Sequence, residues 1–434
     1  MMHNLSVDSK YDSVTDLKTI YEFYKLDLSA QEGAILLIGL DHFRTVINNY
    51  GYTKGNSILH SFARILQDTC KELPIFRFTG DEFIVVIPRA TTEKEVVHIY
   101  HRIKEELEKR EESDPDRYNS VTLSTGALFY PRDGKKQATL IANLEHSLEY
   151  VKEHNRHHLA FFSDKIATQH KRTLELRNAL SKSLNNNFEG FRLVYQPILR
   201  EGSRKLYAFE SLCRFQTEEF PHVSPLEFIK MLEESGDITR LGIFVMKEAL
   251  RQGKIWKQYK KDLVIGFNVS YIQFMDPVFI EALFEEQEKQ GIRPQSIALE
   301  LTESMQIENP LALKKVVSHL REHGFRVSFD DFGTAYATLG LIRRLQVDSL
   351  KIDQSFIKEL ASPDNIVDLA IIDSIQALAK RLDIQIIVEG VENKVLDDIV
   401  SHLDIDFVQG YYYAMPLEAD EFGKFMKENV DPNI

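Results

Sequence analysis

The sequence has 434 residues, of which 43% are hydrophobic and 27% charged, a composition that excludes a wholly disordered chain. Its formal net charge is -13 at pH 7, so we expect no broad surface for a DNA or RNA polymer. Its two cysteines exclude a disulfide framework and a cysteine-based zinc site. No run approaches the roughly 20 apolar residues that a membrane span needs, and residues 1–10 do not read as a signal peptide. We therefore expect a cytoplasmic protein without a membrane span.

The first part of the chain alternates strand and helix patterns. Strands are predicted at residues 34–40, 75–78, 83–87, 121–129 and 159–162, and helices at 56–66, 93–109 and 141–152. The strands at 75–78 and 83–87 flank Thr79-Gly80-Asp81-Glu82, a sequence typical of a hairpin tip. This alternation predicts a compact α/β sandwich.

A polar stretch without Pro or Gly follows at residues 163–184 and predicts a connecting helix rather than a flexible linker. Three consecutive Asn residues, 185–187, then interrupt the helical pattern. We therefore predict a first domain over 1–165, a connecting helix over 166–187 and a second domain over 188–434.

The second domain contains eight short apolar runs separated by long helical segments, and each run ends in a polar residue. These polar residues are Gln196, Glu210, Asn268, Glu300, Asp330, Lys351, Glu389 and Gln409. Eight such units predict a TIM-like (β/α)8 barrel, so the expected fold class is α/β, a sandwich followed by a barrel. Barrel enzymes carry their active sites at the C-terminal ends of the strands, where these side chains would meet.

The carboxylates among these side chains point to bound cations. Carboxylates that converge on one rim repel one another unless a cation lies among them, and all-oxygen ligand sets favour Mg²⁺ or Mn²⁺. Asp331 adds a carboxylate beside Asp330, and such a pair suits a shared ligand between two ions in phosphodiester hydrolysis. Any single carboxylate at a strand end is equally well explained as a helix cap. Caps do not account for Lys351 and two amides on the same rim.

The motifs around these residues form a long ordered set. One of them is Glu210-Ser211-Leu212. The others are Tyr195-Gln196-Pro197, Cys213-Arg214-Phe215, Asn268-Val269-Ser270, Glu300-Leu301-Thr302-Glu303, Asp330-Asp331-Phe332-Gly333-Thr334, Lys351-Ile352-Asp353, Glu389-Gly390-Val391-Glu392 and Gln409-Gly410-Tyr411. In this set the second domain resembles the EAL family of cyclic di-GMP phosphodiesterases, over about residues 171–429. Ser211 replaces the Ala that is usual in the family motif, and we expect activity to survive that change.

The resemblance implies metal-dependent hydrolysis of cyclic di-GMP to linear 5′-phosphoguanylyl-guanosine, with two Mg²⁺ or Mn²⁺ ions and a homodimer. It implies that the metal ligands are Glu210, Asn268, Glu300, Asp330 and Asp331. It implies catalytic roles for Lys351, Glu389 and Glu210, and substrate contacts for Gln196, Arg214 and Gln409. Glu303 would anchor the loop that starts at Asp331. In that loop Ala335 stands where the family usually has Gly, so we expect a change of rate rather than loss of activity.

The first domain resembles the GGDEF family of diguanylate cyclases over about residues 12–162, on its Thr79-Gly80-Asp81-Glu82-Phe83 motif. The resemblance implies that its α/β sandwich is nucleotide-cyclase-like. The first domain departs from the family pattern at positions that serve the cyclase reaction. Gly39 stands at the position of a metal-binding Asp, and Ile47 and Asn56 replace residues that read guanine. We therefore expect no synthesis of cyclic di-GMP.

The remaining polar groups of the first domain, Asp81, Glu82 and Lys54, leave two roles open: a regulatory site that senses GTP, or a scaffold for dimerisation. For the whole protein the alternative to an enzyme is a non-catalytic cyclic di-GMP receptor. A receptor has no need of Lys351 and Glu389 together with metal ligands, which favours the enzyme.

Overall fold

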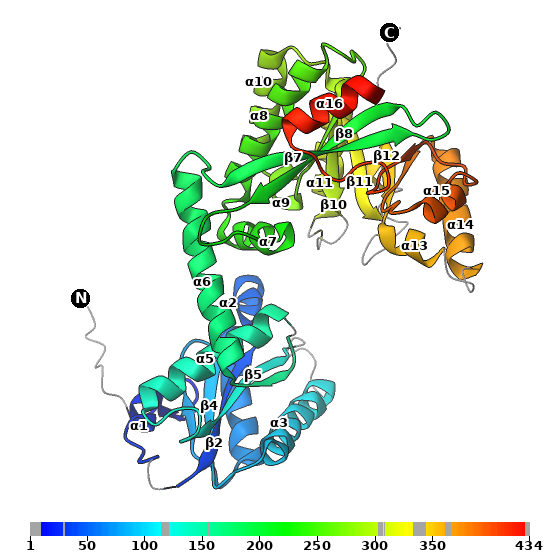
Figure 1. Cartoon of the computed structure of the whole chain (residues 1–434). Helices are drawn as coiled ribbons and strands as arrows, with labels where there is room; N and C mark the ends of the chain where they lie inside the picture. The colour runs from blue at the N-terminus through cyan, green and yellow to red at the C-terminus, as the bar shows by residue number, and fades with distance from the viewer. Residues whose placement is uncertain are drawn as a thin grey trace. The chain divides into compact units, whose positions relative to one another are not determined.

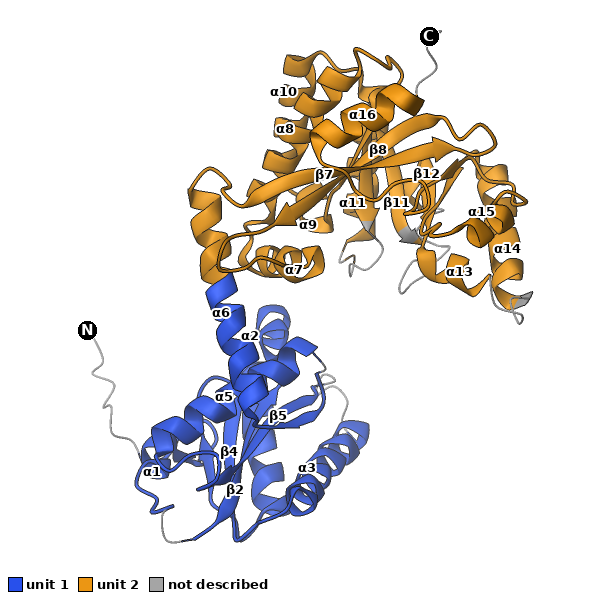
Figure 2. Ribbon diagram, in the orientation of Figure 1, with its two compact units in different colours: residues 1–176 blue, residues 177–434 orange. Residues whose placement is uncertain are grey.

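The computed structural model describes residues 10–28, 31–113, 121–154, 156–302, 307, 309–332, 344–360 and 366–429. The chain divides into two compact units, unit 1 over residues 1–176 and unit 2 over 177–434 (Figure 2). Among the described residues, no helix is both long enough and apolar enough to cross a membrane. The predicted fold class, an α/β sandwich followed by a closed barrel, is confirmed.

Unit 1 is a sheet of six strands in the order β1-β3-β4-β2-β5-β6. The strands are β1 (Lys18–Thr19), β2 (Gly33–Leu40), β3 (Ile75–Arg77), β4 (Glu82–Pro88), β5 (Leu123–Tyr130) and β6 (Leu159–Phe161). The helices are α1 (Ile20–Phe23), α2 (Phe43–Thr69), α3 (Glu93–Ser113) and α5 (Gln137–His154). Helix α6 (Asp164–Asn185) begins in unit 1 and ends in unit 2. Alternate residues of β2 enter two apolar cores, one with α2 and α3 and the other with α1 and α5. The sheet therefore has helices on both faces (Figure 1).

The predicted hairpin of unit 1 is present, because β3 and β4 pair antiparallel around the Thr79-Gly80-Asp81 tip. The helix predicted at 56–66 belongs to the longer α2, which is kinked at Gly51, where φ is 81°. Strand β2 pairs antiparallel with β4 and places Gly39 directly opposite Glu82. The two positions that the family resemblance singled out are therefore cross-strand neighbours.

Unit 2 is a closed barrel with the strand order β10-β11-β12-β13-β14-β7-β8-β9. The strands are β7 (Phe191–Arg200), β8 (Leu206–Phe215), β9 (Val264–Asn268), β10 (Ile297–Thr302), β11 (Arg326–Phe332), β12 (Ser349–Ile352), β13 (Gln385–Val388) and β14 (Phe407–Val408). The helices are α7 (Pro225–Ser235), α8 (Ile238–Trp256), α9 (Tyr271–Phe274), α10 (Pro277–Gln290), α11 (Pro310–Glu322), α13 (Gln354–Glu359), α14 (Ile366–Leu382), α15 (Lys394–Val400) and α16 (Ala419–Asn429). A short 3₁₀ turn, Pro294–Ser296, precedes β10.

The barrel departs from a regular alternation of strands and helices at its first pair of strands. A turn at residues 201–205, not a helix, joins β7 to β8, so β7 runs antiparallel to both β8 and β14. A short turn allows only an antiparallel pair, because a parallel crossover needs a dozen or more residues. The expectation of eight equivalent strand–helix units was wrong at this one place.

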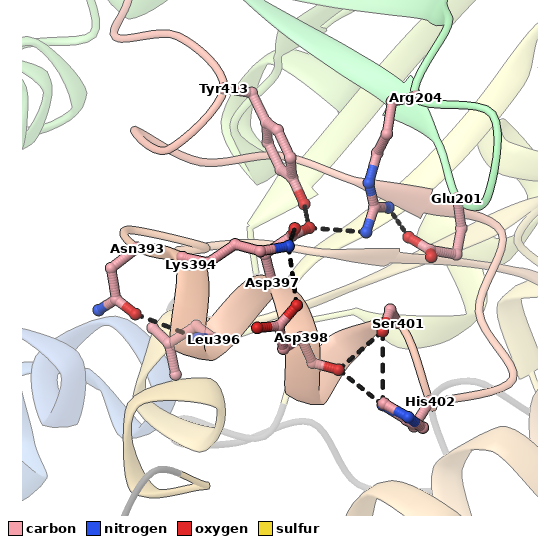
Figure 3. A network of polar contacts seen from close by, with 10 residues as sticks. All are labelled: Glu201, Arg204, Asn393, Lys394, Leu396, Asp397, Asp398, Ser401, His402 and Tyr413. Carbon is pink, nitrogen blue, oxygen red and sulfur yellow. Dashed lines mark hydrogen bonds and ion pairs between the residues drawn. The ribbon is translucent and has the colours of Figure 1, made fainter.

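The junction of β14 with β7 is short and is reinforced by side chains. The two strands pair only through Phe407 with Arg200 and Val408 with Leu199. Beside them the buried carboxylate of Asp397, on α15, accepts hydrogen bonds from Arg204 Nη2 (2.6 Å) and the Tyr413 hydroxyl (2.7 Å), as Figure 3 shows. Asp397 thereby joins the β7–β8 turn, helix α15 and the segment after β14. Burial opposes ionisation, but the bonds from Tyr413, Lys394 and Arg204 lower the pKa of Asp397 overall.

We predict that Asp397→Asn lowers the free energy of unfolding by about 1–3 kcal/mol, because it weakens a buried, charge-assisted network. The neighbouring Asp398→Asn is the control, since the Asp398 side chain is 61% exposed and pairs with Lys394 at the surface. Because the folded pKa of Asp397 lies below its ordinary value of 3.8, its contribution is present at neutral pH and is lost as the pH falls below about 4. Urea unfolding of both variants at pH 7 and pH 3 measures this. Equal stabilities of the two variants at pH 7 would contradict the assignment.

Candidate active site

The barrel interior of unit 2 is built in two layers, apolar below and polar above. The apolar layer contains Ile198, Ala208, Val264, Ile387 and Phe407. Side chains two residues apart on a strand point to the same face. Two residues further toward the rim, the same five strands therefore present Gln196, Glu210, Gly266, Glu389 and Gln409. The predicted polar rim therefore rests on an apolar floor.

The centre of the polar layer is the ammonium group of Lys351. Its Nζ lies 2.6 Å from Glu389 Oε1, 2.8 Å from Glu300 Oε2, 3.0 Å from Glu210 Oε2 and 3.1 Å from Asp330 Oδ1. Lys351 is 1% exposed, and Glu210, Glu300 and Asp330 are also buried. Five of the predicted site residues are thus brought together from strands β8, β10, β11 and β12 and the residue after β13.

Two features of the backbone make room for this cluster. A Cβ atom at Gly266, on β9, would collide with the carboxylate of Glu300, so only glycine allows that side chain to lie across the neighbouring strand. The pairing of β11 with β12 is irregular between Phe329 and Phe332, at the point where Asp330 enters the site. Such irregularities re-aim side chains and are common beside active sites.

The charges of the cluster are strongly coupled. Burial, together with the carboxylates of Glu210 and Asp330, raises the pKa of Glu300 to about 8 against the opposing effect of Lys351. Burial likewise raises the pKa of Glu389 well above its ordinary value. Lys351 and hydrogen bonds from Gln409 and Asn268 outweigh burial at Glu210 and lower its pKa. The surrounding carboxylates hold the pKa of Lys351 well above its ordinary value although burial opposes this. One ammonium group therefore stays protonated among more negative charge than it can balance.

Amide groups orient the carboxylate of Glu210. Gln409 Nε2 donates to Glu210 Oε2 at 2.8 Å and to Gln196 Oε1 at 3.0 Å, and Asn268 Nδ2 donates to Glu210 Oε1 at 2.7 Å. The amide oxygens of Asn268 and Gln409 are buried and have no hydrogen-bond partner among the described residues. An unpartnered buried oxygen is an acceptor that a cation can satisfy.

The cluster fits a divalent cation. Ligand oxygens of Glu210, Glu300 and Asp330 lie within 4.8 Å of one another, and the free amide oxygen of Asn268 is adjacent. The set contains only oxygen ligands and carries excess negative charge, which suits Mg²⁺ or Mn²⁺ better than zinc.

The remaining predicted site residues of unit 2 are Arg214, Glu303 and Asp331. Arg214, further along β8, donates from Nη1 to the carbonyl oxygen of Cys213 and lines a neighbouring cavity. Glu303 and the side chain of Asp331 lie outside the described part of the chain, as does Ala335, so their predicted roles stay predictions.

The neighbouring cavity, of about 250 Å³, was not predicted from the sequence. It opens beside Asn268 and Asp330 and is lined by residues of α7 and α8, among them Ile229 and Leu241. Ser211 and Glu233 also line it. In the sequence the helical residues carry only an amphipathic pattern, which indicates an inward face but not a cavity.

In unit 1, the surroundings of Gly39 and Glu82 differ from the carboxylate cluster of unit 2. Lys152 Nζ, from α5, lies 2.8 Å from Glu82 Oε1, and a Cβ atom at Gly39 would lie 3.3 Å from Lys152 Cε. Ile47 packs against the apolar core. Burial raises the pKa of Asp81, against the effect of Lys152. Lys54, on α2, is partly buried. Lys152 therefore lies beside Gly39 and contacts the carboxylates of both Glu82 and Glu149, the latter at 3.4 Å.

We predict that the unit 2 cluster binds Mn²⁺ and that Glu300→Gln lowers the affinity by about 10-fold or more, because it removes a charged ligand. With its pKa near 8, Glu300 is mostly protonated at pH 6, and a cation must displace that proton. The affinity of the unsubstituted protein should therefore rise between pH 6 and pH 8, and this rise should shrink in Glu300→Gln. Calorimetric titration with Mn²⁺ measures both effects.

The control for this titration is Glu286→Gln, which changes another buried carboxylate. Glu286 pairs with Lys289 on the outer helix α10 and is 4% exposed. Its substitution should leave Mn²⁺ affinity unchanged, and equal losses in both variants would count against the cluster as the binding site.

Comparison with known proteins agrees with this architecture. The family model described as "EAL domain" matches residues 177–416, and the model described as "Diguanylate cyclase, GGDEF domain" matches residues 11–158. The signaling protein YkoW of Bacillus subtilis is 28% identical over 96% of this chain and 53% of its own length. A Pseudomonas aeruginosa protein named cyclic di-GMP phosphodiesterase NbdA is 26% identical over 96% of this chain and 54% of its own length. The chain thus spans about half the length of these curated relatives.

Among solved structures, the PaMucR phosphodiesterase in complex with c-di-GMP is 28% identical, with a TM-score of 0.53 over 57% of this chain and 99% of that one. The chain belongs to the EAL domain family and carries a GGDEF domain ahead of its EAL domain.

Proposed function

We propose that unit 2 hydrolyses cyclic di-GMP to linear 5′-phosphoguanylyl-guanosine in a reaction that depends on Mg²⁺ or Mn²⁺. The observation that carries the proposal is the ammonium group of Lys351 held within 3.1 Å of four carboxylates at the barrel rim. The match to the EAL family and the relatives that are named cyclic di-GMP phosphodiesterases support this substrate.

In this proposal Glu210, Asn268, Glu300 and Asp330 hold the cations, and Asp331 reaches the second one. Bound divalent ions supply Lewis acidity and a more acidic water. The protein's own part is positional. Lys351, which keeps its proton, orients an oxygen of the reacting phosphate or the attacking water.

The remaining groups complete the proposed site. Glu389, whose pKa is raised, is suited to take the proton of the attacking water at its carboxylate. Gln409 and Gln196 keep the Glu210 carboxylate in position through their hydrogen bonds. Arg214, whose side chain lines the cavity, would contact a phosphate of the substrate through its guanidinium group.

For unit 1 we propose a regulatory or dimerisation role without cyclase activity. Gly39 offers no ligand, Lys152 already pairs with Glu82, and Ile47 presents an apolar side chain where a base reader would stand. GTP sensing through Asp81, Glu82 and Lys54 is tested by adding GTP to the hydrolysis assay. A change in rate would assign unit 1 a sensor role, and an unchanged rate favours a scaffold.

We expect the purified full-length protein to convert cyclic di-GMP to the linear dinucleotide with Mg²⁺ or Mn²⁺ but not with a chelator.

Glu210→Ala should abolish turnover because it removes a charged ligand. Lys351→Ala should lower kcat by about 100-fold or more and change KM little, because its loss removes an oriented charge from the reaction centre. Chromatography of the products measures these rates. Binding of cyclic di-GMP without any turnover would favour a receptor instead.

We expect no cyclic di-GMP from GTP and Mg²⁺ or Mn²⁺ in a diguanylate cyclase assay, because unit 1 lacks a metal ligand at Gly39. The assay should use the Glu210→Ala variant, so that any product accumulates rather than being hydrolysed by unit 2. Accumulation of cyclic di-GMP would overturn the assignment of unit 1 as inactive.

A further inference from the structure

Two histidines lie side by side at the end of helix α11. His319 and His323 are four residues apart in the sequence, and the centroids of their rings are 4.4 Å apart. His323 follows the last residue of α11 and keeps helical backbone angles, so both side chains lie on one face of the helix. Both residues are exposed. A pair of imidazole groups is therefore accessible at the surface of unit 2.

A backbone hydrogen bond determines which nitrogen of His323 carries the proton. Its Nδ1 lies 2.8 Å from the carbonyl oxygen of His319. A carbonyl oxygen only accepts, so Nδ1 donates, and the neutral ring then has its lone pair at Nε2. Histidines that bind metal ions almost always donate their other ring N–H to a carbonyl or carboxylate oxygen in this way. The Nε2 atom of His323 is therefore prepared as a ligand.

Aromatic packing holds both rings in place. The ring centroid of Phe284, on α10, lies 5.1 Å from that of His323 and 5.7 Å from that of His319. Phe325 packs edge to face on Phe284 at 5.2 Å. Side chains that are already ordered lose little conformational entropy when they bind a ligand. The two imidazole groups are thus arranged before an ion binds.

The chemistry of the pair indicates which kind of ion it suits. Two histidines at positions i and i+4 on one helix face form a zinc-binding arrangement, with zinc–nitrogen bonds of about 2.0–2.1 Å. Rings 4.4 Å apart are close enough for both to reach one ion. Imidazole suits Zn²⁺ and similar transition ions, whereas Mg²⁺ and Mn²⁺ prefer oxygen ligands. The histidine pair and the carboxylate cluster around Lys351 therefore differ in the ions that they favour.

We propose that His319 and His323 bind one Zn²⁺ ion, or a similar ion that prefers imidazole, with water in its remaining ligand positions. The site is separate from the carboxylate cluster and does not depend on the proposed hydrolysis. The bound ion clamps the last turn of α11, which leads into β11, the strand that carries Asp330. A transition ion thereby binds unit 2 without entering the cluster.

The test measures the protection of single histidines from diethyl pyrocarbonate. This reagent modifies exposed imidazole nitrogens but not a nitrogen whose lone pair is bound to a metal ion. The full-length protein is treated in excess Mg²⁺, with a series of Zn²⁺ concentrations, and is then digested with trypsin. Cleavage after Arg321 places His319 and His323 in different peptides, so mass spectrometry reports on each of them separately.

His154 is the internal control. It is also exposed, and its Nδ1 lies 3.0 Å from the carbonyl oxygen of Tyr150, four residues earlier. Its ring stacks on the ring of Tyr150, with centroids 4.3 Å apart. His154 therefore shares the exposure and the backbone contact of His323, but a tyrosine stands where the pair has its second imidazole.

We expect Zn²⁺ to protect His319 and His323 together, over the same range of concentrations, and to leave His154 reactive. Mg²⁺ alone should protect none of the three. His319→Ala should raise the Zn²⁺ concentration that half-protects His323 by about 10-fold or more, because one of two protein ligands is lost. His154→Ala should leave that concentration unchanged.

The opposite results are equally clear. Protection of neither member of the pair would mean that the histidines only pack on Phe284, and would overturn the proposal. Protection of one member alone, equal protection of His154, or unchanged protection of His323 in His319→Ala would also overturn it. The measurement does not involve cyclic di-GMP, so failure of this proposal and failure of the proposed function are distinguishable.

Discussion

The buried ion cluster around Lys351 is the constraint on which the rest of unit 2 depends. Four carboxylates lie within 3.1 Å of one buried ammonium group, so loss of Lys351 would leave all four without this cation. The amides of Gln196, Asn268 and Gln409 hold the carboxylate of Glu210 or its partners. Such a cluster is costly in a protein core and is retained where it serves chemistry.

The barrel positions this cluster and is itself closed by polar contacts. Its seam between β14 and β7 has two residue pairs, and Asp397 ties the flanking turn, helix and segment together (Figure 3). The segment so fixed begins after β14, and Gln409 at its start orients Glu210. A polar network outside the barrel therefore supports the geometry of the site inside it.

The surroundings of Lys351 in unit 2 differ from those of Lys152 in unit 1. In unit 2 one lysine faces more carboxylates than it can neutralise, which leaves negative charge for cations. In unit 1 Lys152 pairs with Glu82, a second contact reaches Glu149, and Gly39 adds no charge. Lys351 is 1% exposed and has four carboxylates around it, whereas Lys152 is 19% exposed and has two. This difference in number and burial distinguishes a cation site from an ordinary ion pair.

The sequence by itself determined the sandwich-then-barrel architecture and the rim residues Glu210, Glu300, Asp330, Lys351 and Glu389, because apolar runs that end in polar residues report strand ends wherever strands are buried. The antiparallel direction of β7 was missed, although residues 197–206 between the two predicted runs are too few for a parallel crossover. Only the tertiary structure decided that Gly266 makes room for Glu300, that Asp397 closes the barrel seam, and that a cavity opens beside Asn268. These three features depend on contacts between segments that are distant in the sequence, and local residue patterns do not predict such contacts.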